Sequence, residues 1–175
     1  MSIQNVNTRS TRVQDLFGWM LDVYYYLTEF LSASSESVKI TPDGGIAVKF
    51  KNRTGAVSVK GYVVTASSSY DNSVSLIVVD APNPIGVIYE SGIPDGGDVW
   101  VVVSGKAHIY FVGNTTRGNF ARGFLSSDVG YVSGQALSEA YPTSPFASDK
   151  HFYEIGHVLE SRTGAGLALT VLHFN

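Results

Sequence analysis

The residues best suited to chemistry in this sequence are its four histidines, His108, His151, His157 and His173. His151 and His157 fall in or beside a predicted strand at an even spacing, so they could share a face, but about 20 Å would separate them along it. One metal ion cannot bind both, and a shared site would need His108 or His173 from a neighbouring strand. We therefore interpret the histidines as residues at the rims of strands and predict no metal site.

The acidic residues and the absence of known catalytic motifs likewise argue against a reactive site. Asp95-Gly96-Gly97-Asp98 lacks the alternating acidic spacing and the distal glutamate of a calcium loop, and it predicts a hairpin turn. Glu90, Glu154 and Glu160 lie in or beside predicted strands and are interpreted as solvated or ion-paired carboxylates. There is no cysteine, no Gly-x-Ser-x-Gly elbow and no phosphate-binding loop. We predict no catalytic residue, no cofactor and no enzyme activity.

Composition limits the partners. Hydrophobic residues make up 44% and charged residues 15% of the 175 residues, which is typical of a globular protein. The net charge of −3, without a cluster of Lys or Arg, predicts no nucleic-acid partner. No run approaches the roughly 20 apolar residues of a membrane span, and the polar start lacks the apolar core of a secretory signal. We expect no membrane partner and assembly in a cytoplasm.

The first element predicted to position side chains is a helix over residues 11–31. Asp15, Asp22 and Glu29 recur every seventh residue on a solvated face. Three consecutive tyrosines, residues 24–26, point in three directions, so some of them must face a partner or solvent. Either the phenols snorkel from an ordinary amphipathic helix, or the helix packs against other copies or a capsid surface. The predicted interface stripe is Val13, Phe17, Met20, Tyr24, Leu27 and Leu31.

A small polar run, residues 32–37, separates this helix from a β-rich region. We predict two domains: residues 1–37, an amphipathic helix with a polar linker that serves assembly or anchoring, and residues 38–175, a β-domain. Residues 126–149 predict a long surface loop. Runs rich in Val, Ile and aromatic residues, separated by turn clusters, predict strands at residues 46–50, 57–64, 74–79, 85–89, 99–103, 107–112, 152–159 and 167–174.

The predicted fold class is mainly β, a small antiparallel β-barrel or sandwich preceded by one N-terminal amphipathic α-helix. Antiparallel pairing is expected because no helical segment that could connect parallel strands lies between the predicted strands. The run from Val99 to Val103 is continuously apolar and so must be covered on both faces. We expect part of the barrel to be buried against another subunit or the helix.

Several segments resemble tailed-bacteriophage head proteins of the decoration (cement) or auxiliary capsid type. They are KNRTGAVSVKG (51–61), IGVIYESG (85–92), VWVVVSGKA (99–107), TRGNF (116–120), HFYEIGHVLES (151–161) and LHFN (172–175). The resemblance implies a structural virion protein that decorates and stabilises a phage capsid. It further implies a homo-oligomer, with a trimer favoured, that contacts the major capsid protein on the capsid surface after assembly in the host cytoplasm.

Three alternatives stay open from the sequence. The first is a cupin-like β-barrel enzyme or small-molecule binder, because the run of residues 94–107 is similar to a cupin's turn and strand. The metal-binding His-x-His with a following glutamate is missing from it, however. The second is the base protein of a head fibre. The third is a host-encoded adhesion or shell module with the same strand content.

Overall fold

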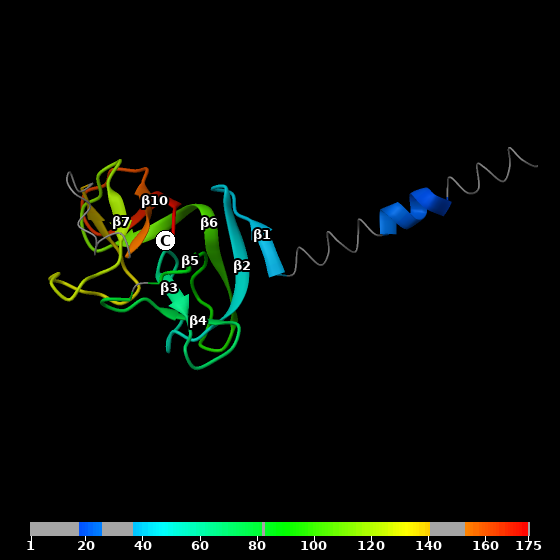
Figure 1. The fold of residues 1–175 in the computed structure, drawn as a ribbon, viewed down its shortest axis with the longest axis horizontal. Helices are drawn as coiled ribbons and strands as arrows, with labels where there is room; N and C mark the ends of the chain where they lie inside the picture. Colours follow the sequence, from blue (N-terminus) through cyan, green and yellow to red (C-terminus); the bar gives the residue numbers. More distant parts are fainter. Residues whose placement is uncertain (1–17, 26–36, 82, 141–152, 175) are drawn as a thin grey trace, which may run out of the picture. The chain divides into compact units, whose positions relative to one another are not determined.

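The computed structural model describes residues 18–25, 37–81, 83–140 and 153–174 (Figure 1). The chain divides into two units, Met1–Ser37 and Val38–Asn175. In the first unit, residues 18–25 form a helix. The second unit is built of strands, which confirms the mainly β fold class. Among the described residues, no helix combines the length and the apolar character needed to cross a membrane.

The described strands of the second unit form one sheet in the order β1-β2-β4-β3-β5-β6-β10-β9-β7-β8, and β2 also pairs with β6. The longest strand, β6, adjoins β2 and β5 along its first half and β10 along its second (Figure 1). The strands are β1 (Val38–Ile40), β2 (Gly45–Asn52), β3 (Val63–Ala66), β4 (Ser73–Leu76), β5 (Gly86–Ile88), β6 (Asp98–Phe111), β7 (Phe120–Arg122), β8 (Leu137–Glu139), β9 (Glu154–Val158) and β10 (Gly166–Leu172).

Five of these strands form a closed circuit of pairing, which we call the ring: β2, β4, β3, β5 and β6. The ring closes because β2 runs antiparallel to β6 from Gly45↔Gly105 to Lys51↔Asp98 and also meets β4 at Lys51↔Ser73. The β2–β4 pair is parallel, so the sheet is mixed rather than purely antiparallel. No crossover helix is needed, because β3 pairs with the far side of β4 and reverses the chain between the two parallel strands.

The apolar run in β6 is buried on both faces, as its composition predicts. Val99 and Val101 lie in one buried cluster, which we call the ring cluster and which also contains Val64, Val74 and Ile88. Val102 faces the opposite way, into a larger cluster with residues of β7, β9 and β10. The chain thus covers both faces of this run with its own strands, and burying the run needs neither another subunit nor the helix.

A β-bulge in β6 allows one strand to serve two halves of the sheet. The register with β2 moves from Ile46↔Ser104 to Ala47↔Val102 and leaves Val103 as an extra residue. Before the bulge even-numbered side chains face the larger cluster, and after it odd-numbered ones such as Ile109 do. Gly105 follows at φ 80°, where a Cβ would lie 2.5 Å from the Gly44 carbonyl oxygen, so only glycine fits.

Several strand boundaries differ from the prediction. The predicted strands 99–103 and 107–112 are one strand, because the chain between them forms a bulge and not a turn. Residues 57–62 are not strand, since Ser58 is held by the segment before β6: its N–H donates to the Ile93 carbonyl and its hydroxyl to the Glu90 carbonyl. The predicted loop 126–149 contains β8, while residues 141–149 lie outside the described residues. The short strands β1 and β7 were not predicted.

Candidate functional site

The helix over residues 18–25 exposes most of its large apolar side chains. Of the predicted interface stripe, Met20 is 53% exposed and Tyr24 is 62% exposed. Trp19 and Leu21, which the predicted stripe omits, are exposed as well. Apolar side chains therefore surround this helix rather than occupy one line on it. The other stripe residues, Val13, Phe17, Leu27 and Leu31, lie outside the described residues.

A second exposed apolar surface lies where the sheet begins, and we call it the β1 edge: Val38, Ile40 and Ile46. Ile40 is paired with Ile46 and is 81% exposed, while Val38 and Ile46 are 40% and 45% exposed. In the described part of the chain, β1 pairs only with β2, so its other side presents free backbone groups beside these side chains. An apolar edge strand of this kind is a site for pairing with another chain.

The opposite face of the same strands is basic and aromatic. The Lys39 ammonium lies 4.4 Å from the ring centroids of both Tyr89 and Trp100, and that of Lys49 lies 5.0 Å from Trp100. The pKa of Lys39 lies below its ordinary value, mainly because partial burial disfavours the charged form. The nearby Glu90 opposes this shift, and Lys49 adds to it. These cation–π contacts cover Trp100 and leave the β1 edge as the apolar side of this corner.

Buried charges hold together the strands β7, β8 and β9, which we call the wing. Arg122 donates two hydrogen bonds to the Asp128 carboxylate, at 2.6 and 3.0 Å, and a third to Glu139. It also donates to the Gly123 carbonyl. Burial by itself would lower the pKa of the Arg122 guanidinium, but the bonds from Asp128 and Glu139 outweigh it and raise the pKa. The guanidinium thus ties β7 to β8 and to the loop between them.

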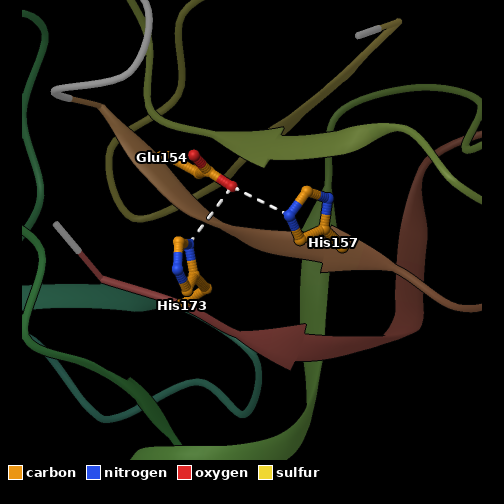
Figure 2. Close-up of side chains that lie close together, drawn as sticks. All are labelled: Glu154, His157 and His173. Atoms are coloured by element: carbon orange, nitrogen blue, oxygen red, sulfur yellow. Dashed lines mark ion pairs between the residues drawn. The ribbon is translucent and has the colours of Figure 1, made fainter.

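The densest group of potential metal ligands in the described residues is Glu154, His157 and His173, of which the first two lie in the wing strand β9 and the third lies just after β10. Figure 2 shows both imidazoles directed at the Glu154 carboxylate. Its Oε1 lies 3.2 Å from His157 Nε2 and 3.5 Å from His173 Nδ1. The Glu154 side chain is 1% exposed, against 39% for His157 and 59% for His173. The group therefore consists of a buried carboxylate and two imidazoles that are partly exposed to solvent.

A second β-bulge brings Glu154 and His157 together. Side chains three residues apart point to opposite faces of a regular strand. Here the register between β7 and β9 passes from Ala121↔Gly156 to Arg122↔Glu154, which leaves Ile155 as an extra residue. The bulge reverses the alternation, so both side chains lie on one side of β9.

The third member, His173, is placed by the backbone just after β10. Its N–H donates to the Ile155 carbonyl at 2.9 Å and extends the pairing of β9 with β10 by one step. Gly156 makes this approach close, because a Cβ there would lie 2.0 Å from the Val171 carbonyl oxygen. The Phe120 ring packs edge-on against His157, with centroids 5.8 Å apart.

The sequence analysis named His173, beside His108, only as a neighbouring-strand histidine that a shared site would need, and it did not link Glu154 to the histidines. It paired His157 with His151, which lies outside the described residues, and assigned Glu154 to solvated or ion-paired carboxylates. The ion-paired interpretation agrees with the geometry, whereas Glu154 is buried rather than solvated. His108 is elsewhere, with its Nδ1 3.1 Å from Asp43 Oδ2. Even spacing was the signal used to place two histidines on one face of a strand, and a bulge is the feature that makes such spacing fail.

The described strands define a class of fold, a small mixed β-sheet closed into a ring, and the chain is similar in fold to a solved structure. That structure is the N base of the head fibre protein gp8.5 of bacteriophage phi29, with a TM-score of 0.50 and 14% sequence identity. The match covers 73% of this chain and 94% of that chain. At this identity the likeness shows a common fold. No protein-family model and no curated protein sequence matches the chain.

Proposed function

We propose that this protein is a non-catalytic structural component of a tailed-phage virion, located on the head. The observation that carries the proposal is the fold likeness to the phi29 head fibre base, which extends over 94% of that chain. The resemblance of several sequence segments to phage head proteins supports the same class of protein. A fold by itself does not specify a function, so the exposed surfaces of this chain must also suit the role.

Two surfaces suit a protein that assembles with copies of itself. The helix over residues 18–25 presents large apolar side chains, among them Trp19 and Met20, and the β1 edge presents Ile40 beside free backbone groups. Monomeric proteins rarely leave such groups uncovered. We assign the contacts between copies to these two surfaces, in a closed homo-oligomer with a trimer favoured.

The finer role is attachment to the outer shell. We favour the base of a head fibre, because the fold neighbour is a fibre base, and keep capsid decoration as the second form of the same proposal. In both forms the partner is the major capsid protein, the location is the capsid surface, and assembly occurs in the host cytoplasm. Contacts repeated by symmetry would make many weak interactions collectively strong.

The first experiment is the native mass of the purified full chain, measured by size-exclusion chromatography with light scattering. We expect three times the mass of one chain, independent of concentration. Ile40→Asp should weaken the trimer because it places a charge in the β1 edge. Val129→Asp is the matched control, since Val129 is 91% exposed and lies outside both surfaces. It should leave the mass unchanged.

The second experiment tests the location. The protein should co-sediment with heads of its phage that were assembled without it, and Ile40→Asp should reduce the amount bound because fewer copies act together. A monomer at every concentration that also fails to bind heads would overturn the proposal. Saturable binding of a small organic molecule by such a monomer would instead favour the cupin-like alternative.

A further inference from the structure

We propose that Glu154, His157 and His173 form a binding site for one zinc ion per chain. The donor set is one carboxylate oxygen and two imidazole nitrogens, which all lie within 4.8 Å of one another. Histidine with a carboxylate is a common zinc ligand set in proteins. This site shares no residue with the surfaces assigned above to assembly and does not rest on the proposed function.

Two of the three distances between donor atoms already match those of a metal site. Bonds of about 2.0 Å place neighbouring ligands of a tetrahedral zinc ion about 3.3 Å apart. The two contacts of Glu154 Oε1, 3.2 Å to His157 Nε2 and 3.5 Å to His173 Nδ1, lie on either side of that value. Small rotations of the two exposed imidazoles are then enough to bring all three atoms onto one ion.

The surrounding structure holds the ligands in place before any ion binds. Glu154 and His157 are fixed by the bulge in β9, and the backbone of His173 is fixed by its hydrogen bond to Ile155. The Phe120 ring restricts the His157 side chain. Ligands on paired strands lose less conformational freedom on binding than ligands on loops, which favours affinity.

The ligand types select the ion. Calcium and magnesium prefer six or more oxygen ligands and would find one carboxylate here. Imidazole nitrogens favour zinc and its first-row neighbours, and three protein ligands leave a fourth position open. Because Glu154 is buried and His173 is 59% exposed, that position faces solvent, where water can fill it. A bound ion would link β9 to the residue that follows β10 and so fasten the C-terminal end of β10.

Isothermal titration of untagged, chelator-treated full chain with zinc chloride tests the site. We expect one zinc ion per chain with a dissociation constant below about 10 μM. His173→Ala and His157→Ala should each weaken binding at least about tenfold, since each removes a ligand. His108→Ala is the matched control, because it removes a histidine that lies with Asp43 and away from the site. It should bind like the native chain.

Spectroscopy adds a readout of ligand geometry. Cobalt(II) in place of zinc should give the intense visible absorption of a four-coordinate ion, and His173→Ala should abolish it while the circular dichroism spectrum stays native. Glu154→Gln is a less safe variant because the side chain is buried, so His173→Ala is the primary test. The proposal is overturned if the native chain binds no zinc, or if His157→Ala and His173→Ala bind it as tightly as His108→Ala.

Discussion

The ring and the wing use opposite physical means to hold short strands together. Ring strands are covered by aliphatic side chains on both faces, as Val101 and Val102 show. The wing contains Arg122 and Glu154, which are both buried and sit at paired positions on β7 and β9. A closed circuit of strands leaves few polar edges and tolerates an apolar interior, whereas the wing depends on satisfied buried charges. Two members of the ligand group, Glu154 and His157, belong to the wing, and the third, His173, follows β10.

The largest effect is expected from Arg122→Met, which tests whether charge holds the wing. Removing the guanidinium leaves Asp128 and Glu139 without their shared cation, at side-chain exposures of only 17% and 27%. We expect the free energy of unfolding to fall by about 3 kcal/mol, measured by urea denaturation. Arg122→Lys keeps the charge but loses the pair of hydrogen bonds to Asp128. Its free energy of unfolding should lie between those of the native protein and Arg122→Met. Equal stability of the native and Met proteins would show that the charges are not what holds the wing.

A smaller effect is expected from Val101→Ala in the ring. Two buried methyl groups contribute about 1.6 kcal/mol by transfer, and the cavity brings the expected loss to about 2 kcal/mol. The loss should be the same at low and high salt, because no charge takes part. A loss that depends on salt would remove the distinction between ring and wing. The losses in free energy of unfolding of Arg122→Met and Val101→Ala, both measured in urea, compare the wing directly with the ring.

The smallest effect is expected from Asp98→Asn at the exposed start of β6. The hydrogen bond from Lys51, at 2.7 Å, lowers the pKa of Asp98 from its ordinary value of 3.8. Since the pKa is lower in the folded protein, any stabilisation is present above 3.8 and is lost as the pH falls through the folded value. The pair is exposed and screened by water, so the melting temperature at pH 7 should match that of the native protein. A clear drop would mean that exposed pairs matter as much as buried ones.

The sequence was sufficient to predict the elements whose side-chain pattern is regular. The ring strand β2 and the closing strand β10 were predicted close to their observed bounds, because apolar residues recur in them at strand spacing. The buried character of residues 99–103 was also predicted, since a run without polar residues has no face for water. What covers the run was not predictable, because β7, β9 and β10 are distant from it in the sequence.

The site was not predictable for a different physical reason. Strand alternation assigns Glu154 and His157 to opposite faces, and only the bulge at Ile155 places them on one. No local composition marks that bulge except the adjacent Gly156. Three-residue strands such as β7 are likewise too short to show a period, although Arg122 within β7 organises the wing. The sequence analysis therefore predicted no metal site, although it named His173 among the neighbouring-strand histidines that a shared site would need.

The two bulges also determine which changes in chain length the fold can accept. Deleting Val103 or Ile155 would restore regular alternation and turn every side chain on one half of the strand to the wrong face. Loss of one codon at either position would thus damage the protein more than substitution of the same residue. A lengthened turn between β3 and β4, where residues 67–72 are mostly exposed, would leave the register intact. Homologues should therefore differ in length in such turns and keep the residue count of β6 and β9 constant.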